Sequence, residues 1–337
     1  MDRRPPGAGA DSTAPAAAAI LAAMIRPPPL RRGDVVRVIA PGSPFDRAQL
    51  DAGLAVLRDR FGLAPRLRDD VGARRGHLAG DDARRLAEWR EAVADPEARA
   101  ILAARGGYGA MRLLPGIDPA PLLARPRLVV GFSDVTAIHA HLNRAGLATL
   151  HGPVVAQLGR LPADALLHLE RLLFGGAGTA PDAGAPPPGT GLAAASVVTP
   201  GRATGPLLGG SLALLAHLCG TPHLPELAGA ILFLEDVGER PYRLDRYLTQ
   251  LRLAGALDRL AGVAIGQLTR CDDGDGAAAA VVRAEIAALG VPAVEGLAAG
   301  HEDRNLALPL GPRATLVAPG PGEPGPPRLL FDEGATA

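Results

Sequence analysis

Lysine is absent from the 337 residues, so all 35 of the residues counted as lysine or arginine are arginine. This absence excludes every chemistry that depends on a lysine amine. A Schiff base with a carbonyl substrate, a serine–lysine dyad and the phosphate-binding lysine of a P-loop are all ruled out. Any catalysis must therefore come from other side chains.

The chain also has few cysteines and no net charge. Its two cysteines, Cys219 and Cys271, lie far apart, so we expect neither a disulfide framework nor a cysteine-based metal site. The 35 acidic residues balance the 35 basic ones, which leaves no field to attract nucleic acid or an anionic membrane. No apolar run approaches the roughly 18–20 residues that span a bilayer. We expect a cytoplasmic protein without nucleic-acid or membrane partners.

The first thirty residues are rich in alanine and proline. A short apolar stretch follows Arg3 and Arg4, as it does in a secretion signal, but two prolines and two aspartates interrupt the pattern. We interpret residues 1–30 as a disordered tail, and a secretion signal is the alternative.

Beyond this tail, short apolar runs alternate with segments of helical periodicity. Strands that alternate with helices of ten or more residues indicate βαβ units and a parallel sheet. The predicted strands cover residues 35–40, 100–104, 128–131, 147–150, 230–234, 263–268 and 314–317, and the predicted helices cover residues 46–61, 81–93, 135–144, 211–218, 241–253 and 277–289.

The length of the chain favours two domains. Residues 175–191 are dominated by glycine, alanine and proline without periodicity, which is typical of a linker. We therefore predict an N-terminal α/β domain at residues 31–172, a linker at 173–200 and a C-terminal domain at 201–334.

The segment Gly131-Phe132-Ser133-Asp134-Val135 places a serine between a buried strand and a helix. A serine at such a turn is lifted out of the sheet, and the helix N–H groups point at negative charge that develops beside it. The segment departs from the G-x-S-x-G pattern because residue 135 is valine. Ser133 or Asp134 would also suit a helix cap, and this segment taken alone favours the cap over the nucleophile.

The segment Arg105-Gly106-Gly107-Tyr108-Gly109 forms a second predicted strand-to-helix turn. Its three glycines permit positive φ angles and let a ligand approach the backbone. The turn could bind phosphate, supply an N–H group to an oxyanion hole, or be a tight turn without a ligand. It does not fit the G-x-G-x-x-G pattern of dinucleotide-binding turns.

Two further polar segments could complete a catalytic site. Glu235 and Asp236 end a buried strand, where ligands bind in open α/β sheets, although helix capping explains Asp236 as well. His301 lies in a polar loop and would suit a general base, with a surface histidine as the alternative. His151 is the rival base, which we interpret as structural or substrate-lining. Ser133, His301 and Glu235 together supply a nucleophile, a base and an orienting acid.

A zinc peptidase is disfavoured, because the residues after His301 do not form an H-E-x-x-H motif. We expect no metal at this site.

These motifs resemble the LD-carboxypeptidase family, serine peptidases that include murein tetrapeptide carboxypeptidases and microcin C immunity-type proteins. The resemblance covers about residues 31–320, and its motifs occur in the order of the family. The matching stretches are VIAPGSP at 38–44, ARGGYGAMRLLPGID at 104–118, GFSDVTAIHAHL at 131–142, LHGPV at 150–154, GPLLGGSLALLAHLCGTP at 205–222, ILFLEDVGERPYRLDRYLTQL at 231–251 and GHEDRNLALPLG at 300–311.

The resemblance implies a triad of Ser133, Glu235 and His301, with an oxyanion hole formed by the backbone N–H groups of Gly107 and Asp134. It implies an α/β fold: a flavodoxin-like N-terminal domain, whose parallel sheet carries helices on both faces, and a smaller β-rich α/β C-terminal domain. It also implies a homodimer without a metal or another cofactor.

The expected function is that of a serine carboxypeptidase that releases the terminal D-Ala from a small muropeptide, murein tetrapeptide, in peptidoglycan recycling. Arg240, Tyr108 and His151 are candidate substrate-binding residues. Arg240 is chosen because it lies near Glu235 in the sequence and an arginine fork suits a carboxylate. The alternatives are an immunity-type hydrolase of a peptidyl-nucleotide antibiotic and a non-catalytic small-molecule binding protein.

Overall fold

The structure is a computed structural model that describes residues 24–175, 190–272 and 276–337. Most of the predicted tail and most of the predicted linker lie outside these residues. The described end of the tail packs on the N-terminal domain, because the Ile25 N–H donates to Gly146 and the Leu30 N–H donates to Leu173. The prediction of a tail is therefore wrong for residues 24–30.

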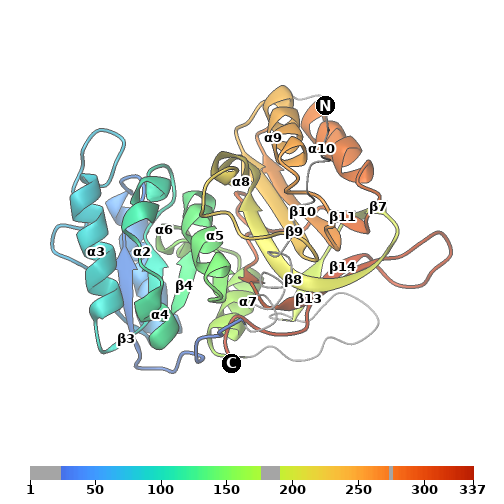
Figure 1. Cartoon of the computed structure of the whole chain (residues 1–337). Helices are drawn as coiled ribbons and strands as arrows, with labels where there is room; N and C mark the ends of the chain where they lie inside the picture. The colour runs from blue at the N-terminus through green and yellow to red at the C-terminus, as the bar shows by residue number, and fades with distance from the viewer. Residues whose placement is uncertain (1–23, 176–189, 273–275) are drawn as a thin grey trace, which may run out of the picture.

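The N-terminal half is built on a mostly parallel sheet (Figure 1). In the described residues its strand order is β12-β5-β4-β3-β1-β2, and β12 alone runs antiparallel to its neighbour. Its central strands β3 and β4 are largely buried apolar runs, as expected for strands covered on both faces, whereas the edge strand β2 is mostly exposed. The strand bounds are β1 Val35–Ile39, β2 Ala64–Arg66, β3 Ala98–Ala103, β4 Leu128–Gly131, β5 Thr149–His151 and β12 Leu308–Leu310.

Helices cover both faces of this sheet, which confirms the predicted architecture. One apolar cluster joins α2, α6 and α7 to one face, and a second joins α3, η2, α4 and α5 to the other. The helix predicted at residues 46–61 divides into an α-helix and a π-helical turn. The bounds are α2 Arg47–Ala55, η1 Val56–Arg60, α3 Asp82–Ala94, η2 Ala110–Gly116, α4 Ala120–Ala124, α5 Thr136–Arg144, α6 Val155–Leu158 and α7 Ala163–Leu173.

The C-terminal half contains a mixed sheet with the described strand order β6-β14-β13-β8-β9-β10-β11-β7, in which β8 to β11 are parallel. Helices α8, α9 and α10 pack on one face of it. The bounds are β6 Gly191–Ala193, β7 Ser196–Thr199, β8 Gly201–Ser211, α8 Leu212–Leu218, β9 Ile231–Val237, α9 Pro241–Leu253, β10 Gly262–Thr269, α10 Ala277–Ala287, β11 Ala293–Glu295, β13 Arg313–Ala318 and β14 Arg328–Phe331.

The prediction of a linker is wrong at its C-terminal end, because β6 and β7 lie within residues 173–200. Both strands are held by partners remote in sequence: β6 pairs with β14, and β7 pairs with β11. Such pairing is decided by tertiary contacts rather than by local propensity.

The two halves share one hydrophobic core. A single apolar cluster runs from Val38 of β1 through Leu169 of α7 to Phe233 of β9 and Leu316 of β13. The chain also returns from the second half to the first, where β12 pairs with β5. The halves are therefore packed as one body, and the crossing segment lies between β11 and β12.

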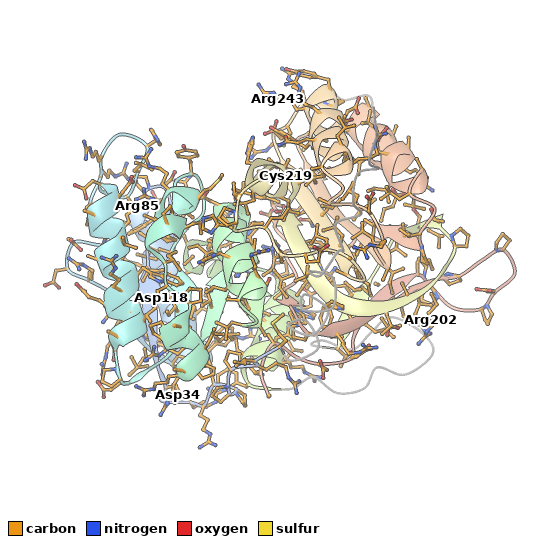
Figure 2. All side chains as sticks on the ribbon, viewed as in Figure 1. Asp34, Arg85, Asp118, Arg202, Cys219 and Arg243 are labelled. Atoms are coloured by element: carbon orange, nitrogen blue, oxygen red, sulfur yellow. The ribbon has the colours of Figure 1, made fainter. Side chains whose placement is uncertain are left out.

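Charged side chains lie on both halves, from Arg85 and Asp118 on the first to Arg202 and Arg243 on the second (Figure 2). The zero net charge thus arises from charges spread over the molecule. Within the described parts of the chain, no helix is both long and apolar enough to cross a membrane.

Candidate active site

Ser133 lies where β4 turns into the short η3 helix (Ser133–Val135) that precedes α5. Its φ angle is 62°, in the left-handed region that non-glycine residues rarely adopt. This conformation costs about 1–2 kcal/mol, so the surrounding structure must hold it. Residue 106 of the neighbouring turn has to be glycine, because a Cβ there would lie 2.9 Å from the Ser133 Cβ.

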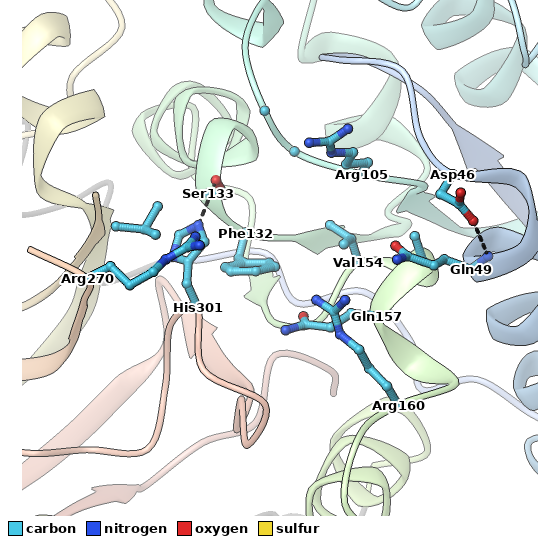
Figure 3. A pocket seen from close by; sticks show the side chains of 14 residues that line it. Asp46, Gln49, Arg105, Phe132, Ser133, Val154, Gln157, Arg160, Arg270 and His301 are labelled. Atoms are coloured by element: carbon cyan, nitrogen blue, oxygen red, sulfur yellow. Dashed lines mark hydrogen bonds between the residues drawn. The ribbon is translucent and has the colours of Figure 1, made fainter. Parts of the chain in front are cut away.

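A hydrogen-bonded relay joins Ser133 to two residues of the C-terminal half. The Ser133 Oγ lies 3.0 Å from the His301 Nε2, and the His301 Nδ1 lies 2.7 Å from the Glu235 Oε2 (Figure 3 shows the first contact). With Nδ1–H donating to the carboxylate, Nε2 is left to accept the serine proton. The structure thus brings together the three residues that sequence analysis selected.

Glu235 points toward Ser133 because of the alternation along β9. Successive side chains of a strand face opposite sides. Ile231 and Phe233 lie in the core that both halves share, whereas Leu232 lies in the core beneath α8, α9 and α10. Glu235 follows Ile231 and Phe233 on the inner face and is fully buried.

Asp236 faces the opposite way and caps α8. Its carboxylate accepts from the Ala213 N–H at 2.7 Å and from the Val237 N–H at 2.8 Å. Burial and the neighbouring Glu235 charge raise the pKa of Asp236 to about 7. The contact with Ala213, in the first turn of α8, is that of a helix-capping residue.

His301 lies on the segment that crosses between the two sheets, and both halves hold that segment. From the C-terminal half, the Gln267 side chain accepts from the Glu302 N–H at 2.9 Å and donates to the Arg304 carbonyl at 3.0 Å. Asn305 accepts from the Gly300 N–H at 3.1 Å. It also donates to the Gln157 side chain of α6 at 3.2 Å. The base is therefore fixed relative to the domain that carries the nucleophile.

The glycine turn lies against Ser133 and is fastened by two side chains. The Asp134 carboxylate accepts from the Ala110 N–H at 2.8 Å, and burial raises the pKa of this carboxyl group. Ser43 binds the other side: its N–H donates to the Gly106 carbonyl at 3.0 Å, and its Oγ accepts from the Tyr108 N–H at 3.0 Å. Gly107 has a φ of 94°, and a Cβ there would lie 2.4 Å from the Ser43 Oγ. The turn therefore presents backbone beside the serine.

Ser133 and His301 open on a cavity of about 530 Å³, whose wall comes from both halves (Figure 3). The lining is polar and rich in arginine. Its residues are Asp46, Gln49, Arg105, Gly106, Gly107, Phe132, Ser133, Val154, Ala156, Gln157, Arg160, Val237, Arg270 and His301.

The three candidate substrate-binding residues are not among the described residues that line this cavity. His151 is fully buried between Phe132 and Phe233, and burial lowers its pKa well below the usual range. Tyr108 is exposed, and its ring packs at a tilt against that of His77. Arg240 is exposed at the N-cap of α9, beyond the end of β9. Arg240 was selected because it lies near Glu235 in the sequence. The chain between the two residues carries Arg240 past the end of β9.

Sequence analysis did not select Arg160, Gln157 or Arg270, and it named Arg105 only as part of the glycine turn. One signal for Arg270 was present, because it lies two residues beyond the predicted strand at 263–268 and the carboxyl ends of parallel strands share one edge. Gln157 lies on a four-residue helix that has no sequence signature of its own, and Arg160 follows that helix.

The comparisons agree with this arrangement. Residues 36–152 match the family profile described as LD-carboxypeptidase N-terminal domain, and residues 204–316 match LD-carboxypeptidase C-terminal domain. Murein tetrapeptide carboxypeptidase of Pseudomonas aeruginosa is 36% identical over 302 residues, which cover 83% of this chain and 92% of that protein. The chain belongs to the LD-carboxypeptidase family.

Other members of the family show how far this likeness extends. Muramoyltetrapeptide carboxypeptidase from Oxalobacter formigenes has a crystal structure that matches with a TM-score of 0.76 at 29% identity, over 89% of this chain and 99% of that one. Microcin C7 self-immunity protein MccF of Escherichia coli is 25% identical over 265 residues, covering 71% of this chain and 77% of that protein. As a member of this family, this LD-carboxypeptidase is a serine-type hydrolase.

Proposed function

We propose that this LD-carboxypeptidase hydrolyses the L,D peptide bond that precedes the C-terminal D-Ala of murein tetrapeptide, with Ser133 as the nucleophile. The observation that carries the proposal is the continuous relay from the Ser133 Oγ through His301 to the buried Glu235 on the wall of an open cavity. The substrate is inferred from the relatives that are named as murein tetrapeptide and muramoyltetrapeptide carboxypeptidases.

In the first step, the His301 Nε2 removes the proton from Ser133 as its Oγ attacks the carbonyl carbon. Glu235 holds the imidazole in the tautomer that accepts this proton and stabilises the imidazolium that forms. The full burial of Glu235 strengthens that interaction, because no water competes for the carboxylate.

The oxyanion of the tetrahedral intermediate lies between the N–H groups of Asp134 and Gly107. Support for this assignment comes from the lining of the cavity by Gly107 and from the hydrogen bond that fastens Asp134 to the glycine turn. Each donor of this kind lowers the barrier by about 3–4 kcal/mol at most. His301 then protonates the leaving amine, and a water activated by the same imidazole releases the acyl group from Ser133.

The lining favours a muropeptide over a peptidyl-nucleotide. The stem peptide of murein carries several carboxylates, and guanidinium groups bind carboxylates in a bidentate manner. A nucleobase would require an aromatic surface. Phe132, the one Phe, Tyr or Trp among the described lining residues, packs instead against His301 and His151.

The cellular setting belongs to the same proposal. The role in peptidoglycan recycling and the homodimeric state derive from the family resemblance, whereas the cytoplasmic location is the expectation from the scarcity of cysteine. Light scattering of the purified chain tests the dimer, and fractionation of the native host tests the location.

The experiment that tests the reaction is mass-spectrometric detection of D-Ala released from purified murein tetrapeptide. We expect release by the wild type and its loss in Ser133→Ala. Ser196→Ala is the matched control, because Ser196 lies on β7 at the far edge of the C-terminal sheet. No release by a folded wild type would overturn the proposed substrate, and undiminished release by Ser133→Ala would overturn the nucleophile.

A further inference from the structure

Arg270 shares an unusual backbone conformation with the nucleophile. In the described residues three non-glycine residues have positive φ angles: Ser133, Arg259 and Arg270. Ser133 and Arg270 both line the cavity, whereas Arg259 does not. Strained backbone of this kind persists where the surrounding structure enforces it, and it is enriched at ligand-binding positions.

The position of Arg270 follows from the sheet. β10 runs parallel to β9, with Leu268 opposite Asp236 and Thr269 opposite Val237. The Gly238 N–H donates to the Thr269 carbonyl at 2.9 Å, so the two strands stay paired to their ends. Arg270 is the next residue, and its φ of 53° turns the chain at the edge where β9 delivers Glu235.

The guanidinium of Arg270 has no ion-pair partner within residues 24–175, 190–272 and 276–337. Asp46 is the acidic residue of the described lining, and its side chain caps α2 by accepting from the Gln49 N–H. Arg105 differs, because its guanidinium donates to the Pro44 carbonyl. Arg270 therefore offers its charge to the cavity.

The catalytic geometry sets where each part of a substrate lies. The leaving amine must be on the His301 side of Ser133, because His301 protonates it. A carboxypeptidase releases one residue, so the free carboxylate lies within one residue of the scissile bond on that side. In Figure 3 the Arg270 side chain extends toward His301, whereas Arg105, Arg160 and Gln49 lie on the part of the cavity wall that the N-terminal half forms.

We infer that Arg270 binds the terminal carboxylate of the leaving D-residue and thereby makes the enzyme a carboxypeptidase rather than an endopeptidase. This inference rests on the proposed function of the site. Arg105 and Arg160 then face the acyl part of the substrate, where the other carboxylates of the stem peptide lie.

The test compares two ligands that differ at one group: murein tetrapeptide with a free C-terminal carboxylate and the same peptide with a C-terminal amide. Binding is measured by calorimetry in the Ser133→Ala background, so that neither ligand is consumed. We expect the acid to bind about 10- to 100-fold more tightly than the amide, as a charge-assisted contact implies. Adding Arg270→Gln should remove this preference, and Arg270→Lys should retain part of it.

Arg259→Gln is the matched control. Arg259 has a φ of 59°, is also exposed and precedes β10 at its opposite end, so this variant makes the same change in the same backbone conformation. It should keep the full preference for the acid. Equal binding of acid and amide by the Ser133→Ala protein, no measurable binding of the acid, or a preference that survives Arg270→Gln would each overturn the inference. The release of D-Ala by the wild type tests the proposed function separately.

Discussion

The two halves of the molecule position their parts of the site by different means. The N-terminal half supplies Ser133 through backbone geometry: a left-handed residue, and a glycine turn whose close approach leaves no room for a Cβ at residue 106. The C-terminal half supplies Glu235 and His301, and side-chain hydrogen bonds from Gln267 and Asn305 hold the His301 segment. A strained turn fixes the nucleophile locally, whereas the base depends on contacts across the whole molecule.

The position of the base depends on contacts with both halves, and the His301 segment accordingly crosses between the two sheets. β12, which follows it, pairs with β5 of the N-terminal sheet. Asn305 also reaches Gln157 in α6. A base anchored in one half alone would follow any relative motion of the halves. With both ends held, the distance from His301 to Ser133 is set by the shared core.

The largest effect is expected from removing one reacting group from each half. Ser133→Ala and His301→Ala should each lower kcat/KM for D-Ala release by about 10⁴- to 10⁶-fold, because neither group acts without the other. The double variant should lose little more than either single variant. Steady-state assays with the amine product quantified by mass spectrometry measure all three. Losses that multiply in the double variant would show that the two halves contribute independently.

A smaller effect on kcat is expected from substitutions at two adjacent residues that lie on opposite faces of β9. Glu235→Gln should lower kcat by about 10⁴-fold, because an amide cannot hold His301 as the carboxylate does. Asp236→Asn, the adjacent substitution of the same kind, should cost less than about tenfold in kcat, because Asp236 caps α8 on the opposite face. Comparable losses in the two variants would contradict the assignment of Glu235 from strand alternation.

Much of this site could be predicted from the sequence, because short local patterns mark its residues. The position of Glu235 at the end of a buried strand is visible in the chain, and so is the strand–turn–helix pattern around Ser133. The parallel sheet followed from strands that alternate with helices, and the family motifs brought the three residues into one site.

The rest depended on contacts between distant segments. The pairing of β12 with β5 and of β7 with β11 joins strands of three or four residues, which are too short to carry a periodic signal. Arg270 follows β10 in a left-handed backbone conformation. Arginine is not typical of that conformation, so its residue type does not predict the turn. Nearness in sequence selected Arg240, which is not among the described residues that line the cavity, whereas Arg270 lines it.

The smallest effect contrasts two buried groups, one in each half, that link stability to pH with opposite signs. Burial lowers the pKa of His139 on α5 to about 4, whereas burial and the Glu235 charge raise the pKa of Asp236 to about 7. Between pH 5 and 6 the unfolded chain holds a proton on His139 that the folded chain lacks, so this group makes the protein more stable as pH rises. Over the same range the folded chain holds a proton on Asp236 that the unfolded chain lacks, so this group makes it less stable as pH rises.

Each variant should therefore reveal the group that remains. His139→Gln should shift the slope of the unfolding free energy against pH downward by about 1.4 kcal/mol per pH unit, and Asp236→Asn should shift it upward by about the same amount. The double variant should return to the wild-type slope. Urea unfolding at pH 5 and 6 measures this, followed by fluorescence of Trp89, the one tryptophan, which is buried in the N-terminal half, and by circular dichroism for the whole chain. If the halves unfold as one body, as their shared core implies, Asp236→Asn changes the slope seen by Trp89 although the two residues lie in different halves. A change confined to circular dichroism would show that the halves unfold separately.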